Sequence, residues 1–193
     1  MKKLIILIFI FPVLCGYAQK WEKNYDFVDN CICGMSKVKK DGKVGYVNKE
    51  GKEIIKLQYD DGLAFNEGYA AVKKETKWLY FDSTGKAITE AVFDDAISFN
   101  NGLAAVSKNN LYGFINTSGE VVIPFEFSNA RGFADGLAPA ANAKGFWGYI
   151  DKKGTWVIKP SYDFTDSFEN GEARVIKGEK VFYIDRQNNI VHN

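Results

Sequence analysis

Few side chains in this chain of 193 residues could carry out nucleophilic catalysis. His192 is the only histidine, and it lies one residue from the C-terminus. Because chain ends are the usual place for disorder, we expect a disordered tail there. A serine or cysteine nucleophile would then lack the histidine base that activates it. The sequence therefore predicts no catalytic residues, and we expect a protein that is not an enzyme.

Two pairs of neighbouring aspartates, Asp60-Asp61 and Asp94-Asp95, could in principle act as acid and base or bind Ca²⁺. The pairs lie 34 residues apart, at one position of an internal repeat described below. Recurrence at a fixed position favours a role in turns, where aspartate side chains hydrogen-bond nearby backbone amides. We therefore expect no metal site and no cofactor.

Cys31 and Cys33 are the only cysteines after residue 18. Two residues apart in a strand, their Cα atoms would lie about 6.5 to 7 Å from each other, at or beyond the range of a disulfide. Two ligands without a nearby histidine are weak evidence for a metal. Free or loosely paired thiols are favoured, and an intermolecular bridge or a metal site remains an alternative.

Aromatic residues make up 15% of the chain and could form a binding surface. A row of aromatic side chains that stacks on sugar rings or binds a partner peptide, called the ladder below, would consist of Trp78, Tyr112, Trp147 and Trp156. The same rings could form the core, because each Trp or Tyr buries roughly 150 to 250 Å². The sequence favours the core and leaves the ladder as the alternative.

The elements that position these residues form a repeat. One glycine recurs every 34 or 35 residues, at Gly34, Gly68, Gly102, Gly136 and Gly171. A phenylalanine stands three residues before it in four copies, and Cys31 takes that place in the first. The five copies span residues 25–58, 59–92, 93–126, 127–161 and 162–193. The one extra residue of the fourth copy falls near Ala143 to Gly145, where a longer loop costs little.

Each copy also contains a hairpin. An aromatic strand ends at an Asx residue, a glycine or asparagine follows three residues later, and an apolar strand returns. The Asx positions are Asn48, Asp82, Asn116, Asp151 and Asp185. We expect each Asx side chain to accept hydrogen bonds from the turn, and the residue three positions later to be left-handed.

In three copies a glycine directly precedes an aromatic residue of the aromatic strand, at Gly45, Gly113 and Gly148. Because glycine has no side chain, we expect it to let an aromatic ring of the adjacent copy lie against the backbone. Leu79 and Phe182 break this pattern. It follows that the second and fifth copies should stack differently, and that the fifth could serve as a cap.

The pattern predicts an all-β fold of five tandem repeats, each a β-hairpin or meander of three or four strands, in an open twisted array. A closed five-bladed, propeller-like ring is the alternative. About 34 residues are few for a propeller blade, which usually needs roughly 40 to 50.

Residues 1–18 have the features of a secretory signal peptide: Lys2 and Lys3, an apolar run from Leu4 to Leu14, and small residues before Gln19. We expect residues 19–193 to form a single repeat domain that is periplasmic, on the cell surface or secreted. A lipoprotein anchored through Cys15 is a minor alternative, since Leu14 stands where such sites have a small residue. No membrane segment is expected after cleavage.

Charge is balanced in the expected mature chain, where 23 basic residues face 24 acidic ones. Such a balance does not indicate the excess of basic residues that binds the phosphates of nucleic acid. The segments Phe133-x-x-Gly-Leu-Ala138, Trp147-Gly-Tyr-Ile-Asp-Lys-Lys-Gly154 and Val157-Ile158-x-Pro160 resemble the WG-repeat family of bacterial exported and cell-associated proteins. This resemblance implies a β-rich binding or scaffolding module without catalytic residues. The expected partner is a protein, or alternatively a carbohydrate or other cell-envelope polymer.

Overall fold

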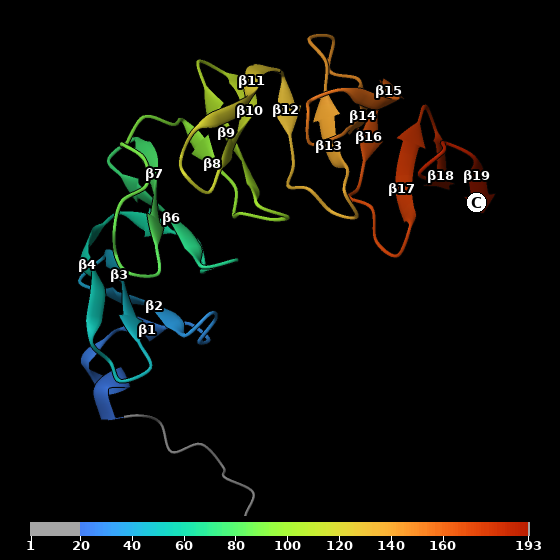
Figure 1. Ribbon diagram of the computed structural model, residues 1–193. Helices are drawn as coiled ribbons and strands as arrows, with labels where there is room; N and C mark the ends of the chain where they lie inside the picture. Colours follow the sequence, from blue (N-terminus) through green and yellow to red (C-terminus); the bar gives the residue numbers. More distant parts are fainter. Residues whose placement is uncertain (1–19, 193) are drawn as a thin grey trace, which may run out of the picture.

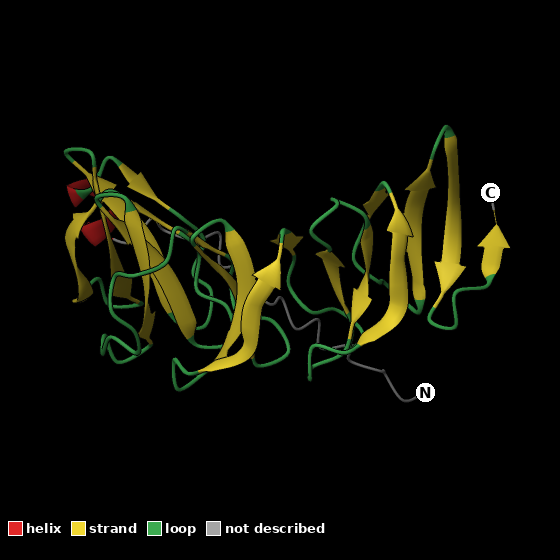
Figure 2. Ribbon diagram, turned by 90° about the horizontal axis from the view of Figure 1, so that it is seen from above, coloured by secondary structure: helices red, strands yellow, loops and turns green. Residues whose placement is uncertain are grey.

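Five antiparallel β-sheets follow one another along the chain in a computed structural model that describes residues 20–192. The prediction of an all-β repeat fold is confirmed, and the array is open rather than a closed ring (Figure 1). Seen from above, the sheets stand side by side along a curve, with the first and fifth sheets at its two ends (Figure 2). The predicted signal peptide lies outside the described residues.

A short 3-10 helix, η1 (Lys20–Asn24), precedes the sheets. The first sheet contains β1 (Phe27–Val28), β2 (Met35–Lys40), β3 (Lys43–Asn48) and β4 (Glu53–Tyr59). The second contains β5 (Asp61–Gly62), β6 (Tyr69–Lys74) and β7 (Lys77–Asp82). The third contains β8 (Asp95–Ala96), β9 (Leu103–Lys108), β10 (Leu111–Asn116) and β11 (Val121–Phe127). The fourth contains β12 (Asn129–Ala130), β13 (Ala138–Ala141), β14 (Trp147–Ile150) and β15 (Trp156–Tyr162). The fifth contains β16 (Phe164–Thr165), β17 (Glu172–Lys177), β18 (Lys180–Asp185) and β19 (Ile190–His192).

Every sheet is a meander in which consecutive strands pair. In the first, third and fourth sheets, the last strand includes the aromatic residue that opens the next copy in the sequence, such as Tyr59 in β4 or Phe127 in β11. The fourth copy holds its extra residue in the loop between β13 and β14, as its spacing predicted.

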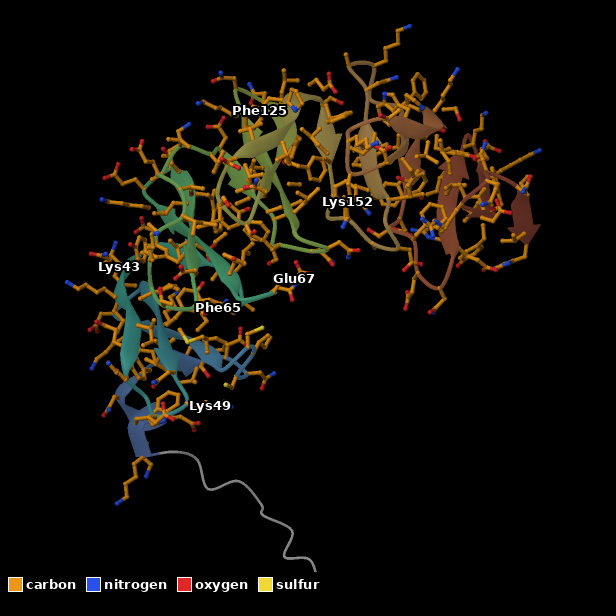
Figure 3. The ribbon with its side chains drawn as sticks, viewed as in Figure 1. Lys43, Lys49, Phe65, Glu67, Phe125 and Lys152 are labelled. Carbon is orange, nitrogen blue, oxygen red and sulfur yellow. The ribbon has the colours of Figure 1, made fainter. Side chains whose placement is uncertain are left out.

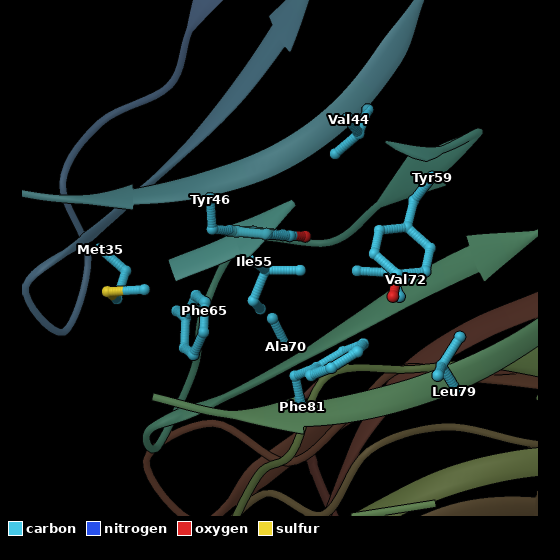
Figure 4. Close-up of a cluster of buried hydrophobic side chains, with 10 residues drawn as sticks. All are labelled: Met35, Val44, Tyr46, Ile55, Tyr59, Phe65, Ala70, Val72, Leu79 and Phe81. Carbon is cyan, nitrogen blue, oxygen red and sulfur yellow. The ribbon is translucent and has the colours of Figure 1, made fainter. Parts of the chain in front are cut away.

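The core lies between neighbouring sheets rather than inside any one of them. Between the first two sheets, Val44, Tyr46 and Ile55 from one side meet Phe65 and Val72 from the other (Figure 4). Three further clusters fill the later junctions in the same way. Each sheet therefore depends on its neighbours for burial, as expected of a repeat array.

One ring contact is repeated at all four junctions. An aromatic ring on the third strand of a sheet packs against the phenylalanine of the next sheet, with ring centroids 4.6 to 5.2 Å apart. The pairs are Tyr46–Phe65, Tyr80–Phe99, Phe114–Phe133 and Tyr149–Phe168. The recurrent phenylalanine is thus the residue by which each sheet docks on the one before it.

The predicted role of Gly45, Gly113 and Gly148 is wrong. A Cβ atom at Gly113 would lie 2.6 Å from the carbonyl oxygen of Ile123, on the last strand of the same sheet, and the other two glycines face β4 and β15 in the same manner. The register shifts at this point of each sheet, which brings the two backbones together. The glycines therefore admit a neighbouring strand of their own sheet, not an aromatic ring of the adjacent copy.

The second copy differs from the others within its own sheet, but the ring contacts at its two junctions are those of the other copies, so the different stacking expected from Leu79 is not seen. Its sheet has three strands, and in place of a fourth only two isolated bridges form, Trp78 with Phe93 and Phe81 with Ala87. A leucine side chain occupies the position where the fourth strand approaches the glycine in the first, third and fourth sheets.

Candidate interaction surfaces

The turns account for the recurrent Asx residues. In each hairpin the Oδ1 atom of the Asx side chain accepts hydrogen bonds from the amides two and four residues later, at 2.8 to 3.1 Å. The residue three positions later has a positive φ, between 70° and 82°. Both expectations are confirmed, so these carboxylates and amides are engaged in the backbone of their own turns.

The first aspartate of each pair also serves a turn. Asp60 Oδ2 accepts a hydrogen bond of 2.7 Å from the Glu75 amide, and Asp94 Oδ2 accepts one of 2.7 Å from the Asn109 amide. The other carboxylate oxygens bind Lys43 and Lys77. The hydrogen bond with Lys43 lowers the pKa of Asp60, and the hydrogen bond with Lys77 lowers the pKa of Asp94. The structural interpretation of these residues is confirmed.

The four aromatic residues singled out as a ligand-stacking ladder come from the second, third and fourth sheets. Trp78 and Trp147 are only 8% and 9% exposed and belong to the buried clusters. Tyr112 and Trp156 are half-buried, and Trp156 packs edge-on against Phe127. The Tyr112 hydroxyl donates a hydrogen bond of 2.6 Å to Asp95, and burial together with this carboxylate raises the pKa of Tyr112 to about 12. All four rings therefore contribute to packing between or within sheets.

Two of the predicted candidates at the chain ends can be placed. Cys31 and Cys33 are free and exposed. The expectation of a disordered His192 is wrong, because this residue lies in β19 and pairs with Tyr183 of β18. Its ring stacks on Tyr183 with centroids 4.3 Å apart, and its Nδ1 lies 3.6 Å from Glu172 Oε2. Strand pairing and these two contacts, which the sequence alone does not indicate, order the residue.

Across residues 20–192, no three His, Cys, Asp or Glu side chains are grouped so that they could hold a metal ion. No helix within the same range has the length and apolar character needed to cross a bilayer.

The concave side of the array carries polar contacts between sheets. Glu67, from the second sheet, accepts hydrogen bonds of 2.8 Å from the amides of Asn101 and Gly102 in the third. Lys152, from the fourth sheet, donates a hydrogen bond of 2.7 Å to the Asn101 carbonyl. Figure 3 shows Glu67 and Lys152 on the inner side of the arc. These contacts join three successive sheets through one turn, which gives the concave side a polar, connected surface.

A cluster at the junction of the fourth and fifth sheets departs from the repeat. Arg131 and Asp166 stand where the second and third copies have Leu63 and Ile97. The Arg131 guanidinium lies 5.3 Å from the Trp147 ring centre and 4.5 Å from that of Phe164, and 3.4 Å from Asp166. The sequence prediction missed these residues because it was built on the residues that the copies share. The indication in the sequence was a charged residue where other copies have an apolar one.

A pocket of about 500 Å³ opens on the fifth sheet beside this cluster. Its lining includes Asp166, Glu169, Glu172, Arg174 and Tyr183. Arg174 Nε donates a hydrogen bond of 2.7 Å to Asp166, so these two charges compensate each other. Glu169 and Glu172 leave the pocket with an excess of negative charge.

Comparison with known proteins gives a family and a fold. The family described as "WG containing repeat" matches residues 45–78, 80–112, 112–142 and 147–180. No curated protein sequence matches the chain. Among solved structures, Hsv2 of Kluyveromyces lactis is 13% identical with a TM-score of 0.55, over 82% of this chain and 58% of that one. Hsv2 of Kluyveromyces marxianus is 9% identical with a TM-score of 0.55, over 84% and 62%. The chain thus spans about three-fifths of these structures, and at such identities the likeness concerns the fold alone.

Proposed function

Because the chain belongs to the WG-containing-repeat family, we propose that it is an exported, non-enzymatic scaffold that binds other proteins. The observation that carries the proposal is the open array itself, in which five sheets bury their core against one another and leave a polar concave side and an end pocket accessible. Stacked repeats of this kind provide extended surfaces for contacts. The recurrent carboxylates are engaged in turns, which supports a binding role over acid–base chemistry.

Export is proposed from the first eighteen residues, whose basic start, apolar run and small residues before Gln19 are typical of a signal peptide. Fractionation of bacterial cells that express the full chain, followed by N-terminal sequencing, tests this step. A mature protein that begins at Gln19 and lies outside the cytoplasm is expected. A lipid-modified N-terminus at Cys15 would establish the lipoprotein alternative, and an uncleaved cytoplasmic chain would contradict export.

The scaffold is tested with the mature chain, residues 19–193, immobilised and exposed separately to envelope proteins and to purified envelope polysaccharide. Saturable retention of particular proteins is expected. Saturable retention of polysaccharide that survives moderate salt and disappears in a folded Trp156→Ala variant would instead support the carbohydrate-binding alternative, because Trp156 is a half-exposed member of the predicted ladder. Turnover of any substrate by the purified chain would contradict a non-enzymatic role.

A further inference from the structure

Three of the four junctions between sheets share the same pair of contacts made by one tyrosine, called the recognition unit below. Besides its ring contact, each tyrosine hydroxyl donates a hydrogen bond to a backbone carbonyl of the next sheet, at 2.6 to 2.7 Å. The bonds are Tyr46 to Leu63, Tyr80 to Ile97 and Tyr149 to Asp166. In every case the carbonyl lies two residues before the phenylalanine that packs on the same tyrosine. The unit therefore recognises a short segment with a carbonyl, one spacer residue and an aromatic ring.

Tyr183 is the fifth member of this series, and within residues 20–192 no sheet packs over it. It pairs with Arg174 in β17 and with His192 in β19, the same registers that Tyr149 has with Pro139 and Ile158. Its hydroxyl has no hydrogen-bond partner within residues 20–192, while its ring is half-exposed and lines the 500 Å³ pocket. One half of the recognition unit is thus presented at the open face of the fifth sheet.

The surroundings of Tyr183 differ in charge from those of the inner tyrosines. Glu172 stands where the fourth sheet has Leu137, directly after the recurrent glycine, and His192 stands where it has Ile158. Glu169 adds a second carboxylate to the pocket. Because an apolar sheet would bury these groups without compensation, the face is unsuited to a further repeat of the same kind. Acidic residues around an aromatic ring instead favour a partner that carries positive charge.

We propose that the open face of the fifth sheet binds an extended cationic peptide that carries one aromatic residue. The aromatic ring packs on Tyr183, and the carbonyl two residues before it accepts a hydrogen bond from the Tyr183 hydroxyl. A lysine or arginine of the peptide lies against Glu169 and Glu172. This inference rests on the proposed scaffold function and names one of its binding surfaces and its partner class.

A second copy of this chain is not the occupant that these contacts fit. In its first sheet Cys31 replaces the phenylalanine that would dock on Tyr183. Trp21 from η1 also packs against Gly51 at that end and donates a hydrogen bond of 3.2 Å to the Lys49 carbonyl. The first sheet therefore lacks the aromatic half of the contact.

The test uses a fluorescent peptide made of residues Ile97 to Gly102 of this chain preceded by two lysines, because that segment already docks on Tyr80. Binding to the mature chain is followed by fluorescence anisotropy. We expect saturable binding that weakens about 3- to 10-fold in Tyr183→Phe, as one hydrogen bond is lost, and that is lost in Tyr183→Ala. Tyr25→Phe, at the opposite end of the array, serves as the matched control and should bind as the wild type does.

Charge is tested with a second peptide in which the two lysines are replaced by glutamates. This peptide should bind more weakly, and Glu172→Gln should weaken binding of the lysine peptide without weakening that of the glutamate peptide. Melting temperatures establish that each variant is folded.

Equal affinity for the two peptides, or unchanged binding to folded Tyr183→Ala, would overturn the proposal. So would binding of a neutral oligosaccharide at Tyr183 in the absence of peptide binding. If the peptide fails to bind while envelope proteins are still retained by the immobilised chain, the end face is rejected and the scaffold function stands.

Discussion

At the scale of single residues, aspartates that close turns should make the protein sensitive to acid. The hydrogen bond with Lys77, aided by the Asn109 amide, holds the pKa of Asp94 below its ordinary value of about 3.9. The folded state therefore binds fewer protons than the unfolded state, so this stabilisation is present above that value and is lost as pH falls through the lowered folded pKa. Urea unfolding at pH 7 and in steps below pH 4 should show a smaller acid-induced loss of stability in Asp94→Asn than in the wild type. Parallel losses in the two proteins would contradict this assignment.

The tyrosine hydroxyls at the junctions should contribute measurably to stability. Burial raises the pKa of Tyr80 far above neutrality, so its hydroxyl remains a donor to the Ile97 carbonyl over the whole physiological range. Tyr80→Phe leaves that carbonyl without its partner and should lower the free energy of unfolding by about 1 to 2 kcal/mol. Tyr183→Phe is the matched control, because its hydroxyl has no such bond in the described chain, and it should change stability by less than about 0.5 kcal/mol. Equal losses in urea unfolding would refute the distinction.

At the scale of strands and sheets, the glycine of the third strand admits the close approach of the fourth strand in the first, third and fourth sheets. A Cβ atom at Gly113 would lie 2.6 Å from the Ile123 carbonyl oxygen and 3.0 Å from Pro124, and both are backbone contacts that cannot rotate away. Gly113→Ala should therefore cost about 2 kcal/mol or more, while Lys108→Ala, at an exposed position, should stay within about 0.5 kcal/mol. Denaturant unfolding of the two variants checks this, and similar stabilities would count against the close approach.

Much of the fold could be predicted from the sequence because its determinants are local and repeated. The Asx turn at Asn116, for example, needs only the residues between Asn116 and Glu120. The role of Gly113 could not be predicted, since it depends on a register shift between two strands. The order of His192 depends on Glu172 and Tyr183, which are distant in sequence. The candidate surface on the fifth sheet could not be predicted from the repeat either, because it consists of residues at which the fifth copy differs from the others.

At the scale of the whole molecule, the polar face of the fifth sheet should keep the array from associating through that end. Inner sheets present apolar residues such as Leu137 and Ile158 to their neighbours, whereas the fifth presents Glu172 and His192, with side chains 45% and 51% exposed. The double variant Glu172→Leu with His192→Ile restores the inner pattern around Tyr183. Exposed apolar faces of this kind drive association, so we expect the variant to self-associate with rising concentration while the wild type does not.

Sedimentation velocity over a hundredfold concentration range measures this association. Glu179→Leu is the control, because it adds a leucine at an exposed position in the turn between β17 and β18. If the double variant remains at the sedimentation coefficient of the wild type, charge on this face does not limit stacking. If the control associates equally, added surface hydrophobicity alone is responsible. Association confined to the double variant would show that two polar side chains at the end of the array prevent association through that face.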